Sequence, residues 1–365
     1  MSRVYVLGAG SSQFAGFPLG STLLAFLKSE WGKTRESVDK REGGYCLDFI
    51  DMIIPYLPEA RRLCGEPDLE FVLSLIDLNS HNSCDEKKCD SLIQDLNAIT
   101  MKIDLSAWDL ERVKRGFAKL VTSAFIFKSY DVKSYQSSNP DQLEAAKDFT
   151  ITPDAWTELI NPGDTLITFN WDLLQEIFLS KAKKWRYEDG YGMEGSAAAG
   201  SLTCSPTTIL KLHGSCNWLL RDSWDSFQGV DYADVFFDQL DADPKNKMPH
   251  GSTSDYGTSL IIPSYLKDPY KVAVLPSLWS RAGEKLRKAT HLTVIGYSLP
   301  DADSFAKSLF QKTIGTNTSL ISIEIIVNGD EKAFRRWQAI CPNIQIDCKV
   351  PQTFKEYVTR NKVDN

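Results

Sequence analysis

The chain of 365 residues lacks an apolar run of the roughly 18–20 residues needed to cross a bilayer, and its first residues, MSRVYVLGAG, lack the pattern of a cleaved signal peptide. It also lacks an excess of basic residues, because its formal net charge is −7. An acidic chain repels the phosphates of nucleic acid and of anionic membranes. We therefore expect a cytoplasmic protein that makes no direct contact with nucleic acid or membrane.

Recognisable metal-ligand patterns are lacking as well. The eight cysteines are scattered, and the two nearest pairs, Cys84 with Cys89 and Cys341 with Cys348, do not form the tight ligand pairs of a structural zinc site. Free thiols in a reducing compartment are the favoured interpretation, and we expect no zinc. Seven aspartates lie between residues 222 and 243, where we favour a solvated surface insertion over a metal site.

What the chain does contain is an alternation of short apolar segments with segments of helical periodicity. Apolar strands that alternate with helices are typical of a parallel sheet covered on both faces. The sequence therefore predicts the α/β class, with a doubly wound, mostly parallel Rossmann-like sheet. The predicted strands are residues 3–7, 165–169, 207–214, 259–263, 291–299, 322–328 and 344–348.

Residues 35–160 follow a different pattern. Apolar side chains such as Val113 and Phe117 recur there with the spacing of helices, and no alternating strand pattern of useful length occurs. We expect this segment to be a large helical insertion domain. Residues 1–34 together with 161–365 would then form the Rossmann-like domain.

Polar or glycine-rich residues directly follow five of the predicted strands. Ligands of a doubly wound sheet bind outside the carboxyl ends of its strands. Buried polar groups without a partner cost about 1–3 kcal/mol each, so we expect these endings to converge on one crevice and to serve a ligand there. The endings are GAGSS at 8–12, FNWD at 169–172, LHGS at 212–215, GYS at 296–298 and NGD at 328–330.

The segment GAGSS allows two interpretations. Gly8 and Gly10 let the backbone approach a phosphate, to which Ser11 or Ser12 can donate a hydrogen bond. A glycine pair after a strand is as often only a tight turn. Gln13 stands where the dinucleotide fingerprint has its third glycine, which argues against an ordinary dehydrogenase.

His213, Asn170 and Asp172 also have two interpretations each. Asn and Asp are favoured helix caps, and the histidine could be a capping residue or a satisfied core residue. However, one cap is needed rather than two polar residues flanking Trp171, and His213 follows a strand that ends at the predicted crevice. We therefore favour a role in ligand binding for all three.

In their order along the chain, these endings resemble the motifs of the sirtuin family and of its bacterial sirtuin-like relatives. The opening LGAGSSQFAGFP is similar to the sirtuin stretch GAGxSxxSGIPDFR up to its proline, TFNWD to TQNxD, KLHGS to LHG, GYSL to GTSL, and VNGD to the segment IN-x-E. Each motif alone is weak, whereas the five in order span residues 4 to 330.

The resemblance implies that NAD lies across the strand ends as the substrate. It implies that Asn170 holds the ribose or the attacking water, that His213 is the base and that nicotinamide lies near Asp172. It places the pyrophosphate and the adenosine half of NAD at two further groups of residues. These are Gly8, Ala9, Gly10 and Ser11 for the pyrophosphate, and Gly296, Ser298, Asn328 and Asp330 for the adenosine half.

The chain also departs from the sirtuin pattern. The residues at 18–21, PLGS, replace the PDFR of sirtuins, Phe169 replaces the glutamine of TQN, and the paired zinc cysteines are lacking. These differences argue against lysine deacylation. With them, the chain resembles the bacterial branch of the family, which hydrolyses NAD in anti-phage defence. We therefore expect an NAD glycohydrolase (NADase) that releases ADP-ribose and nicotinamide. The alternatives are an NAD-dependent protein deacylase or ADP-ribosyl transferase, and a non-catalytic nucleotide-binding regulatory module.

Such an enzyme needs control, because a free NADase would harm its own cell. We expect no separate sensor domain beside the helical segment. We therefore expect control by assembly through that segment, either as a homo-oligomer or on a separate partner protein such as an ATPase or translocase.

Overall fold

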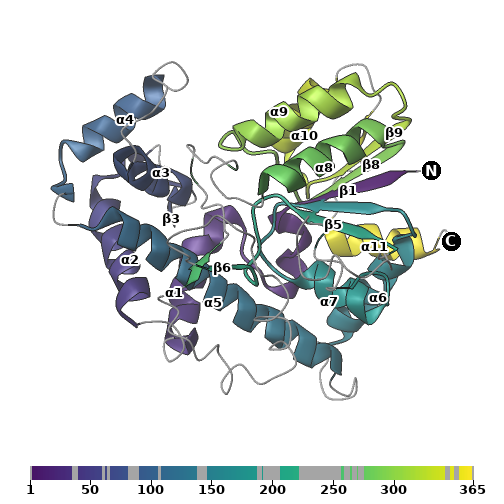
Figure 1. Ribbon diagram of the computed structural model, residues 1–365, viewed down its shortest axis with the longest axis horizontal. Helices are drawn as coiled ribbons and strands as arrows, with labels where there is room; N and C mark the ends of the chain where they lie inside the picture. Colours follow the sequence, from purple (N-terminus) through teal and green to yellow (C-terminus); the bar gives the residue numbers. More distant parts are fainter. Residues whose placement is uncertain are drawn as a thin grey trace.

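The computed structural model describes residues 2–34, 40–59, 62–63, 66–80, 90–105, 108–137, 146–186, 191, 206–221, 256–258, 264, 269, 275–341, 346–348 and 353–363. Within them, six parallel strands form one sheet in the spatial order β10-β9-β8-β1-β4-β5 (Figure 1). The predicted α/β class with a doubly wound, mostly parallel sheet is confirmed. The strands are β1 (Arg3–Leu7), β4 (Thr165–Thr168), β5 (Thr208–Lys211), β8 (His291–Ile295), β9 (Ser322–Ile326) and β10 (Ile346–Cys348).

The direction in which the sheet grows reverses at β1. The chain runs outward from β1 through β4 to β5, then crosses to the other side of β1 and continues through β8 and β9 to β10. Leu7 at the end of β1 pairs in parallel register with Thr168 on one side and with Ile295 on the other. Ligands of doubly wound sheets bind at such a reversal, outside the carboxyl ends of the strands. The topology therefore predicts a binding crevice at the loops after β1 and β8.

Helices cover both faces of the sheet, which explains why its strands are apolar along most of their length. Val4, Tyr5, Val6 and Leu7 of β1 are all fully buried. Helices α6, α7 and α11 lie on one face, and α8, α9 and α10 lie on the other (Figure 1). Their bounds are α6 (Ala146–Leu159), α7 (Leu174–Lys181), α8 (Leu275–Lys288), α9 (Ser304–Thr313), α10 (Glu331–Ile340) and α11 (Phe354–Val363).

A second group of helices, α1 to α5, packs beside the sheet and is called the helical block below (Figure 1). Its centre is the contact between α2 and α5, where Phe49 and Phe117 are fully buried. A short antiparallel pair, β2 (Arg62–Leu63) with β3 (Glu66–Pro67), precedes α3. The helices are α1 (Leu23–Thr34), α2 (Lys40–Ile53), α3 (Leu69–Ser80), α4 (Asp90–Thr100) and α5 (Leu110–Ser137).

Helix α6 packs on the sheet, although it lies within the segment predicted to be the helical insertion. The ring of Trp156, which is fully buried, meets Tyr5 of β1 at a centroid distance of 5.1 Å and Phe354 of α11 at 5.2 Å. Its Nε1 donates to the side chain of Gln175 in α7 at 2.7 Å. These contacts tie α6 to the Rossmann-like part of the molecule, and the predicted boundary at residue 160 stays a prediction.

Two predicted features, the strand at 259–263 and the acidic segment at 222–243, lie outside the described residues. Next to them, β6 (Leu219–Arg221) and β7 (Tyr256–Thr258) form a small antiparallel pair. The other predicted strands are confirmed where their residues are described: β10 covers the described residues of the strand predicted at 344–348, and β4, β5, β8 and β9 end earlier than expected because the following residues turn into loops. In the described part of the chain, no helix is long and apolar enough to cross a bilayer.

Candidate functional site

A cavity of about 580 Å³ opens at the carboxyl ends of the strands. Residues after β1, β4, β5, β8 and β9 line it, so the structure brings the five strand endings together. Ser11 is not among the described lining residues, because it is fully buried and its hydroxyl donates to the carbonyl oxygen of Gly8 at 2.8 Å. The predicted site residues that line the cavity are Gly8, Ala9, Gly10, Asn170, Asp172, His213, Gly296, Ser298, Asn328 and Asp330.

The loops after β1 and β8 pack directly on one another, and this packing requires glycine at three positions. A Cβ atom on Gly8 would lie 2.6 Å from the carbonyl oxygen of Gly296, and one on Gly10 would lie 2.8 Å from the Cα of Gly296. Gly296 itself has a φ of +66°, and a Cβ there would lie 2.3 Å from the amide nitrogen of Ser11. The glycines of GAGSS therefore serve loop packing, a reason that the sequence did not reveal.

The same packing uses backbone N–H groups that could otherwise bind a phosphate at this loop. The N–H of Gly10 donates to the carbonyl oxygen of Gly296 at 3.0 Å, and the N–H of Ser11 donates to that of Gly8 at 2.8 Å. A pyrophosphate at this loop would therefore depend on the N–H of Ala9 rather than on a full cradle of amide groups. Binding of pyrophosphate here stays a prediction.

Asn170 holds the β1 loop in place. Its Nδ2 donates to the carbonyl oxygen of Gly8 at 3.0 Å and to Oγ of Ser12 at 2.9 Å, and it lies 3.3 Å from Oγ of Ser11. Ser12 is in turn hydrogen-bonded to the carboxylate of Asp172. The amide nitrogen of Asn170 is thus committed to the protein, and Oδ1 is the atom that it can offer to a ligand as an acceptor.

A group of charged side chains next to the cavity is closed off from solvent. Lys211 and Glu176 are fully buried and form an ion pair at 2.9 Å, and Lys211 also donates to the carbonyl oxygen of Asp172. Tyr191 donates to Oε1 of Glu176 at 3.1 Å. Burial raises the pKa of the Asp172 and Glu176 carboxyls, and the Lys211 cation partly offsets this rise in both. We call Lys211, Glu176 and Tyr191 the sealed cluster; Asp172, whose backbone carbonyl Lys211 holds, borders it and also lines the cavity.

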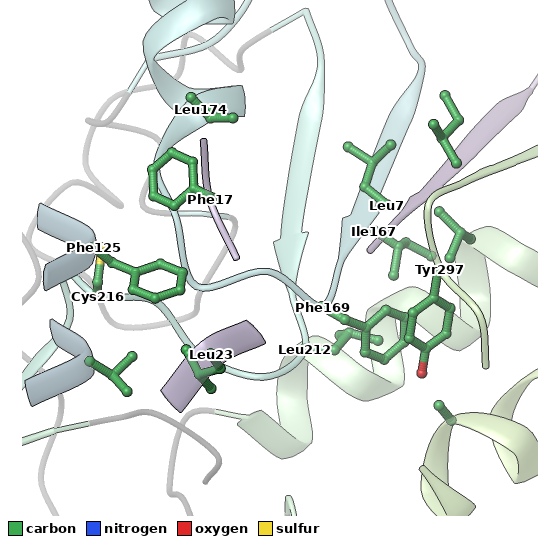
Figure 2. Close-up of a cluster of buried hydrophobic side chains, with 14 of the residues drawn as sticks. Leu7, Phe17, Leu23, Phe125, Ile167, Phe169, Leu174, Leu212, Cys216 and Tyr297 are labelled. Atoms are coloured by element: carbon green, nitrogen blue, oxygen red, sulfur yellow. The ribbon is translucent and has the colours of Figure 1, made fainter. Parts of the chain in front are cut away.

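A second polar group, the histidine cluster of His213, Asp303 and Tyr297, faces the cavity. Nε2 of His213 lies 3.3 Å from Oδ1 of Asp303, whose Oδ2 accepts a hydrogen bond from the Tyr297 hydroxyl at 2.7 Å. Phe169 packs against both rings, stacked on Tyr297 at 4.1 Å and edge-on to His213 at 4.9 Å; Figure 2 shows the stacked pair. Asp303 could not be recognised as a site residue from the sequence, because an aspartate at the start of a helix is equally well explained as a cap.

The loops after β8 and β9 form the other end of the lining. Arg336 of α10 fixes the first loop by donating from Nε to the carbonyl oxygen of Ser298 at 3.0 Å. Asp330 caps α10, since its carboxylate accepts from the N–H of Ala333 at 3.0 Å. Asn328 is exposed and has a φ of +45°, so its side chain lies at a tight turn beside the cavity.

The helical block supplies one wall of the cavity, which the sequence did not predict. Leu69 at the start of α3, Phe125 of α5 and several residues of the loop at 17–23 belong to the lining. Among the described lining residues there is neither lysine nor arginine, and in the described part of the chain no three His, Cys, Asp or Glu are grouped to hold a metal ion. Carboxylates dominate the charge of the wall. They are Asp68, Glu70, Asp172, Asp303 and Asp330.

No family model and no curated protein matches this chain. Among solved structures, it is similar to a mutant Sir2 homologue in complex with 2′-O-acetyl-ADP-ribose, with 14% identity over 100% of this chain and 92% of that chain and a TM-score of 0.41. It is also similar to a Sir2 homologue in complex with NAD, with 16% identity over 100% of this chain and 90% of that chain and a TM-score of 0.40.

Proposed function

We propose that this chain is an NAD glycohydrolase, which cleaves the bond between nicotinamide and ribose and releases nicotinamide and ADP-ribose. The observation that carries the proposal is the meeting of Asn170 and His213, paired with Asp303, in one cavity with the loop after β1. The motif order that resembles the sirtuin family supports the orientation of NAD. Its nicotinamide end would lie near Asp172, and its adenosine end near the loops after β8 and β9.

The charge of the cavity suits this substrate. Nicotinamide bound to ribose is a pyridinium cation, and cleavage passes through an oxocarbenium-like transition state with positive charge on the sugar. Asp172 and Asp303 belong to the lining and are buried, and carboxylates in such positions stabilise developing positive charge. Among the described lining residues, no lysine or arginine opposes them.

The chemistry needs few groups. The bond between C1′ of the ribose and the ring nitrogen breaks, and its electron pair stays with nicotinamide, which leaves as a neutral molecule without a general acid. The oxygen of a water molecule bonds to C1′, and the proton of this water passes to His213, a residue type suited to proton transfer near neutral pH. Oδ1 of Asn170 orients the water, because Nδ2 is held by the β1 loop.

The test is NAD consumption with chromatographic identification of the products, measured with and without an acetylated peptide. We expect equal amounts of nicotinamide and free ADP-ribose without any acceptor. His213→Ala should lower turnover by about 10²-fold or more, the usual scale for losing a general base. His291→Ala is the matched control, because His291 lies at the opposite end of the sheet, bonded to Thr290.

Two other results would contradict the proposal and favour a different function. Acetyl-ADP-ribose formed only with the peptide would indicate a deacylase. Binding of NAD without turnover, under all conditions tested, would indicate a regulatory module.

We further propose that loss of NAD serves anti-phage defence and that assembly controls it. Residues of α3 and α5 line the cavity, so a second copy of the chain or a partner such as an ATPase that binds the helical block can change the shape of the cavity. Light scattering alongside NAD turnover, with and without candidate partners, tests this. A monomer that is fully active at nanomolar concentration and unaffected by every partner would refute control by assembly.

A further inference from the structure

Two aspartates, Asp303 and Asp330, occupy the same position at the start of successive helices, but their carboxylates are used differently. Asp330 accepts a hydrogen bond from the N–H of Ala333 at 3.0 Å and so caps α10. Asp303, the N-cap of α9, makes no side-chain cap hydrogen bond and is only 3% exposed. A buried carboxylate must be balanced by other groups. The groups that balance Asp303 must therefore lie outside its own helix.

Both carboxylate oxygens of Asp303 face aromatic rings of the histidine cluster. Oδ1 lies 3.3 Å from Nε2 of His213, and Oδ2 accepts from the Tyr297 hydroxyl at 2.7 Å. Burial, and secondarily the charge of Asp303, raises the pKa of Tyr297 well above its ordinary value. Tyr297 therefore keeps its proton and acts as a donor, which fixes the orientation of the carboxylate toward His213.

The loop that carries Asp303 is held in a strained conformation. Leu299 has a φ of +52°, a left-handed conformation that is rare for leucine, and it is fully buried. Helix α10 anchors the same loop, since Nε1 of Trp337 donates to the carbonyl oxygen of Tyr297 at 3.0 Å. Strain that the surrounding structure maintains is typical of segments that position functional groups.

We propose that Asp303 is a positioning residue for His213: it accepts the Nε2–H of the imidazole and thereby places the lone pair on Nδ1. One consequence of this pairing, and only this one, rests on the proposed NAD cleavage. In that reaction Nδ1 takes the proton of the attacking water. The carboxylate stabilises the resulting imidazolium without being protonated itself, the role that a carboxylate has in the triads of hydrolases.

Asp303→Asn tests the proposal with little risk to the fold, because asparagine has nearly the same size and the Asp303 side chain makes no cap hydrogen bond that could be lost. The Tyr297 hydroxyl will hold Oδ1 of the new amide, so the NH₂ group faces His213 and Nε2 must become an acceptor. The proton then moves to Nδ1. We expect the ¹⁵N NMR signals of His213 to change from the Nε2–H to the Nδ1–H tautomer, and kcat to fall by about 10²-fold or more at nearly unchanged KM for NAD.

A second variant and a control sharpen the test. Adding Tyr297→Phe to Asp303→Asn keeps the ring that stacks on Phe169 and frees the amide to turn its oxygen toward His213, so the Nε2–H tautomer and part of the turnover should return. Asp301→Asn is the matched control, because the side chain of Asp301 is 76% exposed and pairs with Lys307. It should change neither the tautomer nor kcat.

The chain has four histidines, and His213→Gln identifies the signals of His213. An Nε2–H tautomer that persists in Asp303→Asn, or an Nδ1–H tautomer in the wild type, would overturn the proposal. The NMR measurement needs no turnover. If the wild type fails to cleave NAD, the proposed function fails while the pairing of Asp303 with His213 is still tested.

Discussion

The sealed cluster and the histidine cluster lie at the same strand end and differ in what balances their charges. Lys211, the last residue of β5, is fully buried and is satisfied by Glu176 at 2.9 Å. His213, two residues later, has a side chain that is 11% exposed, lines the cavity and pairs with Asp303. Asp172 borders both groups, because it belongs to the lining and its backbone carbonyl accepts from Lys211.

The difference shows that a polar residue at a strand end is not by itself evidence of a functional site. In the sealed cluster the charged groups are turned toward one another, and they hold the segment after β4 against the end of β5. In the histidine cluster one partner is buried while the imidazole reaches the cavity. Substitutions in the first group should therefore change stability, and substitutions around the second should change turnover.

The largest effect is expected for Lys211→Met, which leaves two buried carboxylates, Asp172 and Glu176, without their cation. Removing one partner of a buried pair costs about 3–5 kcal/mol in the free energy of unfolding. Lys28→Met is the matched control, because it breaks an exposed pair with Asp51 and should cost less than about 1 kcal/mol. Denaturant unfolding measures both variants. An equal loss in the free energy of unfolding would show that the buried pair contributes no more than the exposed pair.

The same variant should also change the dependence of stability on pH. Burial raises the pKa of Asp172 and Glu176, and Lys211 offsets part of the rise, so removing the cation raises both further. A carboxyl whose pKa is raised by folding stabilises the fold at pH values below its pKa in the unfolded chain, which is roughly 3.9–4.3. This contribution is lost as the pH rises through the pKa of the carboxyl in the folded protein. The deficit of Lys211→Met should therefore grow as the pH rises above the pKa of these two carboxyls in the unfolded chain. A constant deficit would contradict this account.

Next in size is Asn170→Ala, which should lower NAD turnover by about 10²-fold, the scale on which misplacing the reacting groups acts. Asn317→Ala is a close control, because Nδ2 of Asn317 also donates to two backbone carbonyls, those of Leu286 and Ala289, but the residue lies outside the cavity lining. Both variants should lose similar stability, and only the first should lose turnover. Equal turnover in the two variants would show that Asn170 has no specific role in the reaction.

The smallest effects are expected at the adenosine end. Ser298→Ala and Asn328→Ala should each raise KM for NAD by about 2- to 10-fold, as expected for one lost hydrogen bond, and leave kcat nearly unchanged, the pattern for uniform binding. Ser319→Ala, at an exposed turn away from the cavity, provides the baseline. A fall in kcat at constant KM would place the reacting end of NAD at these loops and reverse the proposed orientation.

Much of the fold could be predicted from the sequence, because it depends on residues close together in the chain. The apolar segments that became β1, β4, β5, β8 and β9 are short and continuous, and helix starts such as Asp330 follow capping rules. Since parallel strands end at the same edge, the residues after them could be assigned to one crevice without knowing the strand order. Their presence in the lining follows from that rule.

The tertiary structure alone decided which of these side chains meet. The strand order brings the loops after β1 and β8 together, so Gly8 and Gly10 are needed for packing against Gly296. Asp303 fits the local pattern of a cap, yet its carboxylate lies against His213 from another strand. The wall formed by the helical block and the burial of Lys211 were likewise decided only by the tertiary structure. Local patterns depend on neighbours within a few residues, whereas these contacts depend on the distance between segments far apart in the chain, which is set only when the sheet and the helical block pack together.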